Sequence, residues 1–135
     1  MKVLILTVGG SDGPIVKCIE NYRPDHVVFL CTEDEEGKKG SREIVDGGTI
    51  VSMGKECKKC KYKDVSQRAS IINQCGLRQG DYEIHAVPHD DPNKNYKVTL
   101  GLIKNFLDEG HEVIVDYTGG TKSMSVGLAV AAMEY

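Results

Sequence analysis

The sequence predicts an α/β fold with three layers, in which helices cover both faces of a mostly parallel sheet. Short apolar segments alternate with amphipathic helical segments along the 135 residues, and this alternation is typical of parallel strands joined by right-handed crossovers. The apolar segments have few polar interruptions, as expected for strands that are buried on both faces. Glycine-rich turns follow the first and the last of them, at the strand ends where such sheets bind ligands.

The first half of the chain contains two of the four predicted strands. Residues 2–8 are apolar and rich in β-branched side chains, and a glycine pair follows them, so we expect a buried strand. Residues 14–22 are expected to form a helix that begins with a proline and has its apolar side chains on one face. Residues 26–31 predict the second apolar strand.

A charged, glycine-rich stretch over residues 33–63 interrupts this alternation. Within it, a glycine pair separates the apolar residues 44–45 from the apolar residues 50–51. This pattern indicates an insertion outside the core that forms a small hairpin. Apolar residues then recur at helical spacing over residues 65–77, which predicts a helix there.

Two further strand–helix units complete the predicted sheet. Residues 83–87 and 112–115 are short apolar strands, and the amphipathic residues 96–107 between them predict a helix. The last helix, residues 121–135, is apolar nearly all round, so we expect it to be buried on more than one side or to pack against a partner. The order 3-2-1-4, typical of Rossmann-like sheets, places the first and fourth strands side by side.

Composition and charge narrow the classes of protein to consider. The formal net charge of −3 argues against binding of duplex nucleic acid, although residues 38–63 carry eight basic and only three acidic residues. No segment approaches the roughly 20 apolar residues of a membrane span, and the chain enters a strand directly, without a signal peptide. Five cysteines without an export signal fit reduced thiols. We therefore expect a cytoplasmic protein that does not insert into membranes.

The turn after the first strand is the first candidate for a binding site. Gly9 and Gly10 let the backbone approach a ligand closely. Ser11 and Asp12 precede a helix N-terminus, where free N–H groups favour an anion or a ribose hydroxyl. A tight turn with a capping Ser or Asp explains the same residues equally well. The turn lacks the G-x-G-x-x-G spacing of dinucleotide-binding loops.

The turn between the fourth strand and the last helix carries a stronger signal. Glycines, hydroxyl side chains and a lysine at a helix N-terminus make a cradle for an anion. Lys122 opposes the helix dipole, and a bound anion compensates for this cost. A Walker A loop needs glycine immediately before lysine, but Thr121 stands there, so hydrolysis of a nucleoside triphosphate is not expected. The candidate ligand-binding residues of this turn are Thr118, Gly119, Gly120, Thr121, Lys122 and Ser123.

The two turns together resemble those of CARF domains, the nucleotide-sensing Rossmann-like modules of type III CRISPR defence. The resemblance rests on Val8-Gly9-Gly10-Ser11 after the first strand and on Asp116-x-Thr118-Gly119-Gly120-Thr121-Lys122-x-Met124 before a helix of small residues. It covers most of the chain except residues 33–63, and the second motif is the more specific of the two.

This resemblance implies a homodimer that senses a cyclic tetra- or hexa-adenylate across its two-fold axis. The ring would lie between Gly9–Asp12 and Thr118–Ser123, with Lys122 as the main charge and without a cofactor. The resemblance also implies a fused C-terminal antiviral effector that is absent here, so residues 1–135 would be the N-terminal, ligand-binding part of a longer protein. The chain departs from the family by ending after four strand–helix units, where two more strands usually follow.

Two alternatives to a sensor stay open. Some CARF domains are metal-independent ring nucleases, in which the ribose 2′-hydroxyl attacks its own phosphate and the protein supplies positioning and charge. Lys122, with Thr121 or Ser11, would then stabilise the transition state. A generic mononucleotide-binding domain is the other alternative, and it would bind ATP or a dinucleotide but not a cyclic oligomer.

The cysteines of the insertion form a third candidate site. Cys57-x-x-Cys60 supplies half of a zinc site, and Cys75 with His85 or His89 would complete it. A lysine-rich, solvated loop with reduced thiols is the alternative, and the sequence favours it slightly. His89 also follows the third strand and is a candidate for lining the ligand pocket.

Overall fold

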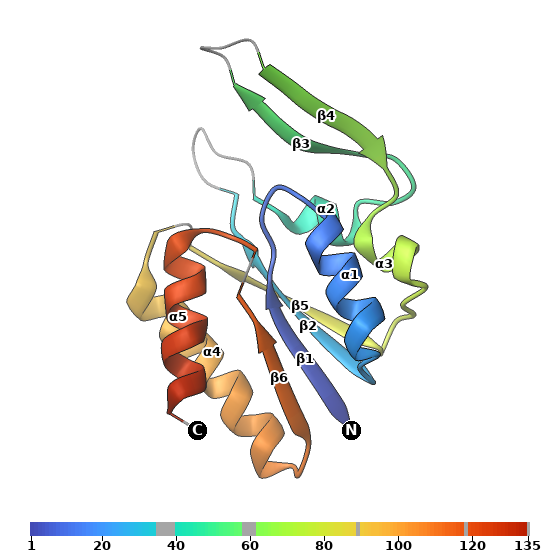
Figure 1. Ribbon diagram of the computed structural model, residues 1–135. Coiled ribbons are helices and arrows are strands. Elements are labelled where there is room, and N and C mark those ends of the chain that lie inside the picture. Colours follow the sequence, from blue (N-terminus) through green and yellow to red (C-terminus); the bar gives the residue numbers. More distant parts are fainter. Residues whose placement is uncertain (35–39, 58–61, 89, 118, 135) are drawn as a thin grey trace.

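A four-stranded parallel sheet lies between two layers of helices (Figure 1). The computed structural model describes residues 1–34, 40–57, 62–88, 90–117 and 119–134. The sheet contains β1 (Lys2–Thr7), β2 (His26–Thr32), β5 (Tyr82–Val87) and β6 (Glu112–Asp116), and a separate antiparallel hairpin contains β3 (Val51–Cys57) and β4 (Tyr62–Arg68). The helices are α1 (Gly13–Tyr22), α2 (Arg42–Asp46), α3 (Ile71–Cys75), α4 (Pro92–Asp108) and α5 (Lys122–Met133).

The strand order in the sheet is β5-β2-β1-β6, and all neighbours are parallel. The predicted Rossmann-like α/β fold with three layers is confirmed. When all six described strands are numbered in chain order, the sheet order reads 5-2-1-6 rather than 3-2-1-4, because the two hairpin strands come between β2 and β5 in the chain. Within the sheet alone, the third, second, first and fourth strands follow one another. Consequently β1 and β6 are neighbours, with Lys2 opposite Glu112 and Leu6 opposite Asp116.

Each face of the sheet has its own apolar core. Successive side chains of a strand point to opposite faces, so Leu4 and Leu6 of β1 pack towards α1–α3, whereas Val3 and Ile5 pack towards α4 and α5. The central strands β1 and β2 are almost completely buried, which explains their continuous apolar sequence. The edge strands β5 and β6 keep most of their side chains partly exposed.

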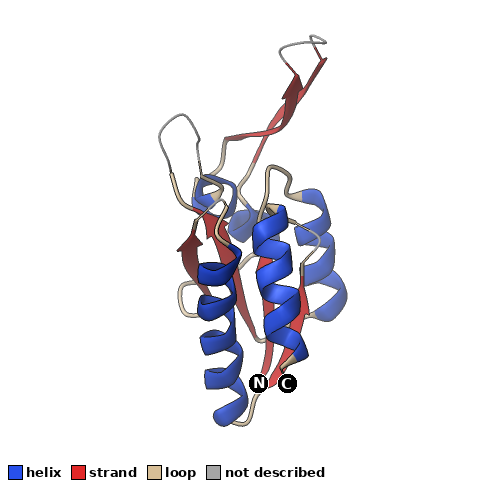
Figure 2. Ribbon diagram, turned by 90° about the vertical axis from the view of Figure 1, so that its left-hand side faces the viewer, coloured by secondary structure: helices blue, strands red, loops and turns tan. Residues whose placement is uncertain are grey.

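The hairpin lies later in the chain than the sequence indicated. The apolar residues 44–45 belong to α2, and Val45 is fully buried in the core beneath α1 and α3. The hairpin instead spans residues 51–68. It projects beyond the carboxyl ends of the sheet strands, at the end of the molecule opposite the two termini (Figure 2).

The helix predicted over residues 65–77 is wrong for its first part. β4 continues to Arg68, and the backbone of Ser70 is still extended, so α3 begins only at Ile71. Gly76, at a φ of 66°, ends the helix, as glycine commonly does in the left-handed region. Over so few residues, strand and helix periodicity are hard to distinguish.

The last helix, α5, is buried on one side only within the described part of the chain. Met124, Leu128 and Ala131 face the core. Gly127 lies against α4, where an added Cβ would come within 2.9 Å of the Tyr96 nitrogen. The outer face of α5 consists of Val126, Val130 and Met133, which are 52%, 44% and 84% exposed. Despite this apolar sequence, none of the described helices has the length and apolarity that a membrane span requires.

Candidate functional site

The β1–α1 and β6–α5 turns lie against each other at the carboxyl edge of the sheet. Thr7 Oγ1 donates a hydrogen bond of 2.5 Å to the carbonyl oxygen of Gly119. A Cβ at Gly9 would come within 2.8 Å of the Gly120 nitrogen. Parallel strands end at a common edge, so the turns that follow the neighbouring strands β1 and β6 meet there. The two candidate turns are thus adjacent, as the strand order predicts.

Contact between the two turns explains why glycines stand at several of these positions. A Cβ at Gly119 would overlap the carbonyl oxygen of Thr7. Gly120 has a φ of 81°, a conformation that glycine adopts without steric cost. Close packing therefore requires these glycines whether or not a ligand approaches them.

Gly119→Ala is expected to destabilise the protein by about 1–3 kcal/mol, because the new methyl group forces the backbones of the two turns apart. Gly13→Ala is the matched control, since a Cβ there meets no atom within 4 Å. We expect it to change stability by less than about 1 kcal/mol. Urea denaturation of both variants measures the difference. Equal midpoints for the two variants would show that the turns do not pack as described.

An exposed lysine stands at the N-terminus of α5, beside these turns. Thr121 is the N-cap, and its side-chain oxygen accepts a hydrogen bond of 3.2 Å from the backbone N–H of Met124. Lys122 is the first residue of the helix and is exposed. Its side chain has no ion-pair partner among the described residues. The N–H groups of Lys122 and Ser123 lie in the first turn, where backbone donors lack partners inside the helix, so this end of α5 favours an anion.

Two serines of α5 have hydroxyl groups that are already engaged. Ser123 donates a hydrogen bond of 2.8 Å to the carboxylate of Asp90, which follows β5. Ser125 donates to the carbonyl oxygens of Tyr117 (2.8 Å) and Gly119 (3.2 Å) and so holds the β6–α5 turn in place. Sequence reasoning missed Ser125. Its only signal is its position one helical turn after the N-cap Thr121, on the side that faces the turn.

Asp12, one of the predicted ligand-binding residues, ties the β1–α1 turn to the base of the hairpin. Its carboxylate, only 3% exposed, accepts hydrogen bonds from Arg68 (2.6 and 3.1 Å) and from Gln74 (2.6 Å). Burial raises the pKa of Asp12, but the hydrogen bonds from Arg68 and Gln74 outweigh it and hold the pKa below its ordinary value. The carboxylate therefore stays charged and paired.

Open surface surrounds the two turns. Gly10 and Ser11 are exposed, and Tyr117 is 51% exposed. A cleft of about 580 Å³ adjoins Ser11 and extends between α1 and the base of the hairpin. Its charged lining residues are two basic ones, Lys17 and Arg68, and two acidic ones, Asp12 and Glu20. The neighbouring turns after β2 and β5 contribute acidic residues, namely Glu33, Asp34, Asp90 and Asp91. The features that favour an anion are therefore the exposed Lys122 and the N-terminus of α5, rather than the charges of the cleft.

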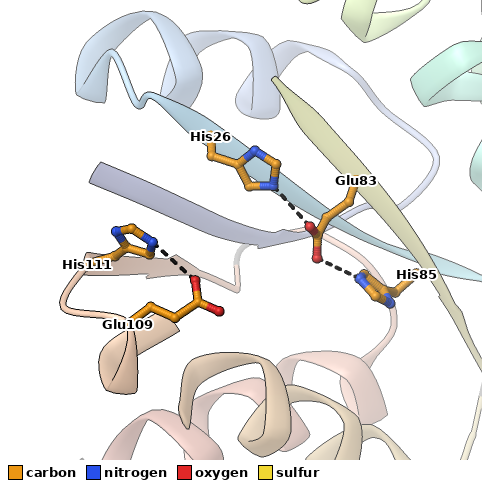
Figure 3. Close-up of polar contacts among 5 residues, drawn as sticks. All are labelled: His26, Glu83, His85, Glu109 and His111. Atoms are coloured by element: carbon orange, nitrogen blue, oxygen red, sulfur yellow. Dashed lines mark hydrogen bonds and ion pairs between the residues drawn. The ribbon is translucent and has the colours of Figure 1, made fainter. Parts of the chain in front are cut away.

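A separate polar cluster occupies the region between β2, β5 and α4 (Figure 3). The Glu83 carboxylate lies 3.0 Å from His26 Nε2 and 2.8 Å from His85 Nε2. Burial raises the pKa of Glu83, but the hydrogen bonds from the two histidines outweigh it, so the pKa lies below its ordinary value. His111 pairs separately with Glu109 at 3.2 Å. His85 is thus engaged with a carboxylate rather than with a cysteine.

The zinc candidate depends on residues outside the described part of the chain. Among the described residues, no group of three or more His, Cys, Asp or Glu side chains is arranged to hold a metal ion. Cys60 and His89 lie outside the described residues, as does the side chain of Cys57. Burial raises the pKa of the Cys75 thiol to about 11. Burial and a hydrogen bond to Asp116 raise the pKa of Cys18 to about 12. Both thiols are therefore protonated at neutral pH.

Two further polar residues form hydrogen bonds that stabilise the carboxyl edge of the sheet, and sequence reasoning identified neither of them. Thr7 was read only as part of an apolar strand, yet its hydroxyl joins the two turns. Ser41 donates to the carbonyl oxygen of Val8 (2.9 Å) and accepts from the N–H of Thr32 (3.0 Å), so it connects the ends of β1 and β2. No local pattern marks Ser41, because its partners come from other segments. Of the predicted residues, Thr118 lies outside the described residues.

The fold and the carboxyl edge define a Rossmann-like α/β protein with a surface suited to a small anionic ligand. No family model matches the chain, and no curated protein sequence matches it significantly.

Proposed function

We propose that the carboxyl edge of the sheet binds a cyclic tetra- or hexa-adenylate, and that the protein is the sensor part of an antiviral CRISPR effector. The observation that carries this proposal is the contact between the β1–α1 and β6–α5 turns. Through this contact the exposed Lys122 and the N-terminus of α5 share one surface with Gly10 and Ser11. The resemblance of both turns to CARF motifs supplies the identity of the ligand.

The chemistry of this surface suits a phosphodiester. Lys122 supplies a mobile positive charge, and the first-turn N–H groups supply fixed donors, the two features that favour phosphate at a helix N-terminus. Ser11 adds a hydroxyl that bonds a ribose hydroxyl or a phosphate oxygen. The exposed ring of Tyr117 offers a face on which an unpaired adenine stacks, as aromatic side chains do in single-strand recognition.

A homodimer matches a ring built of identical units, because a two-fold axis presents the same residues to both halves of the ligand. The outer face of α5 is exposed and apolar at Val126, Val130 and Met133. This face belongs to the helix that begins with Lys122, so a two-fold axis that runs along α5 and pairs the two helices in parallel would bring the two lysines to the same end of the dimer. Burial of apolar surface of this kind drives association.

Isothermal titration with cyclic tetra-adenylate, cyclic hexa-adenylate and ATP tests the proposal. We expect one of the two rings to bind with one ring per two chains, and ATP to bind much more weakly. Binding of ATP without binding of either ring would identify a generic mononucleotide-binding domain and contradict the proposal. So would folded protein that binds none of the three.

Cleavage of the ring is tested separately, because a ring nuclease has the same binding surface. Ligand is incubated with excess protein in the presence of a chelator, and linear products are separated by chromatography. A sensor leaves the ring intact over hours. Linear oligoadenylate that accumulates in the chelator, and that is lost in Lys122→Ala, would assign a ring nuclease instead.

A further inference from the structure

The cleft beside Ser11 lies at the hairpin end of the molecule, away from both termini (Figure 1). Its walls come from the start of α1 and from the segment between β4 and α3, within residues 11–20 and 68–74. Its volume of about 580 Å³ lies in the range of about 300–1,000 Å³ that is typical of small-molecule sites. Because Ser11 also belongs to the β1–α1 turn, a nucleotide held at that turn has the cleft beside it.

A buried carboxylate holds two side chains of the cleft in fixed orientations. Arg68 donates to both oxygens of Asp12, from Nε at 3.1 Å and from Nη2 at 2.6 Å. Gln74 Nε2 donates to the same carboxylate at 2.6 Å and to the carbonyl oxygen of Ala69 at 2.7 Å. Two hydrogen bonds to each group fix the planes of the guanidinium and of the amide, so both are oriented before a ligand binds.

The amide of Gln74 offers a ligand its oxygen rather than its nitrogen. The Asp12 carboxylate and the Ala69 carbonyl accept hydrogen bonds and donate none, so they face the NH₂ group and use both of its hydrogens. Gln74 is exposed and lines the cleft, and no described residue donates to its Oε1 atom. A ligand atom that meets Gln74 must therefore be a hydrogen-bond donor.

Arg68 gives the same cleft a flat surface. Its side chain is 42% exposed, although Nε and Nη2 both donate to Asp12. These hydrogen bonds lie in the plane of the guanidinium and do not cover its faces. Arginine planes stack on unpaired nucleobases in single-strand recognition. Val16 of α1 adds an apolar contact to the lining.

The charges of the lining suit a neutral group. Lys17 and Arg68 balance Asp12 and Glu20, so neither a phosphate nor an amine gains net attraction from them. A nucleobase is neutral, flat and edged with donors and acceptors. The cleft thus combines a stacking surface with one oriented acceptor, the two elements that recognise a base by its edge.

We infer that the cleft binds one adenine of the ring, an inference that rests on the proposed function for the identity of the ligand. The 6-amino group donates to Gln74 Oε1, and the purine stacks on the plane of Arg68. Adenine has an amino donor at this position, whereas guanine has a carbonyl oxygen there, which would face Gln74 as acceptor against acceptor. Gln74 is therefore a residue that determines base specificity.

The second aromatic surface of the edge has a different role. A ring of four adenylates brings two bases to each chain of a two-fold dimer. One stacks on the exposed Tyr117 and another enters the cleft. Stacking alone tolerates any base, because every base has a π-face. Selection of the 6-amino group therefore belongs to Gln74.

NMR titration with two mononucleotides tests the base site without requiring a ring. The probes are 5′-AMP and purine riboside 5′-monophosphate, which has hydrogen in place of the 6-amino group. The signals observed are the side-chain amide of Gln74 and the Nε–H of Arg68. With millimolar AMP we expect both signals to shift, and AMP should bind at least about fivefold more tightly than the probe without the amino group, because one hydrogen bond is lost.

Variants separate recognition of the base from a structural role. Gln74→Met keeps the length of the side chain but removes the acceptor, so the two nucleotides should bind within about twofold of each other. Arg68→Lys keeps the charge but removes the plane, and it should weaken both nucleotides equally, at least about fivefold. Gln67→Met is the matched control and should change neither affinity, because Gln67 is exposed on β4 and neighbouring side chains of a strand point to opposite faces.

Three results would overturn the base site. The first is equal affinity of the wild type for the two mononucleotides, or no binding of either. The second is a preference for AMP that survives in Gln74→Met. The third is binding of AMP without a shift of the Gln74 signal, which would place the base elsewhere.

Ring ligands distinguish failure of the base site from failure of the proposed function. Cyclic tetra-adenylate should bind at least about 20-fold more tightly than the same ring without 6-amino groups, because two chains each lose one contact. Equal binding of these two rings would contradict the base site and leave the ring-binding surface standing. If neither cyclic tetra-adenylate nor cyclic hexa-adenylate binds while AMP keeps its preference, the proposed function fails and the base site stands.

Discussion

Lys122→Ala should weaken the binding of the cyclic oligoadenylate at least about 100-fold. Each charge-assisted hydrogen bond from this lysine to phosphate contributes about 1.5–3 kcal/mol, and a two-fold dimer presents the lysine twice to one ring, so the loss is about 3–6 kcal/mol. Titration of wild type and variant at the same ionic strength measures it. Added salt should also weaken binding less steeply in the variant, because one charge per chain has been removed.

The stability of the same variant distinguishes a binding role from a structural one. Lys122 is exposed and opposes the dipole of α5, so removing it should leave stability unchanged or raise it by about 0.3–1 kcal/mol. Lys104→Ala, at an exposed lysine of α4, is the control and should change neither affinity nor stability. If Lys122→Ala binds as tightly as wild type, or melts many degrees lower, the lysine does not hold the ligand.

Arg68→Ala is expected to lower the free energy of unfolding by about 2–3 kcal/mol at neutral pH. The substitution leaves the buried carboxylate of Asp12 with Gln74 as its side-chain partner, and a buried charge that loses a partner carries a large desolvation cost. Arg42→Ala is the matched control, because Arg42 pairs with Asp46 at 3.3 Å on the surface. That loss should be within about 1 kcal/mol. Equal losses of stability in the two variants would contradict a stabilising role for the ion pair between Arg68 and Asp12.

The dependence of this effect on pH has a definite sign. The pKa of Asp12 is lowered in the folded protein, so its stabilising contribution is present above the unfolded pKa of about 3.9 and is lost as the pH falls through the folded value. The stability difference between wild type and Arg68→Ala should therefore be largest near pH 7 and shrink below about pH 4. Urea denaturation at several pH values measures it. A difference that stays constant down to pH 3 would mean that Arg68 acts through packing alone.

The four strands of the sheet were predictable because each is a short apolar run bounded by glycine or charged residues, as in residues 26–31. The helices α1 and α4 were predictable because their apolar residues recur on one face. The segment between β2 and α3 was not. Its hairpin and its two five-residue helices are too short for periodicity to separate strand from helix, so residues 65–68 were assigned to the wrong element.

The position of the candidate site could be predicted from the sequence, but the structural roles of its individual residues could not. Glycine pairs at the ends of the first and fourth strands, together with the common strand order, placed both turns at one edge. The sequence favoured a ligand as the reason for the glycines of the β6–α5 turn, whereas Gly119 already serves the contact with Thr7. Asp12 stood among ligand-binding candidates, and its charge is paired with Arg68, 56 residues away.

By itself, the sequence determined which segments are buried and where the turns lie. Burial of one face makes apolar residues recur at the spacing of a helix or a strand, and this spacing is visible within a few residues. Only the tertiary structure decided which polar groups meet, because crossovers bring together residues that share no local pattern. Thr7 and Gly119, 112 residues apart, illustrate this. The structure also decided that α5 leaves one apolar face open and that the outer side of β6 is unpaired among the described strands. Both features depend on what stands next to an element, which its own residues do not encode.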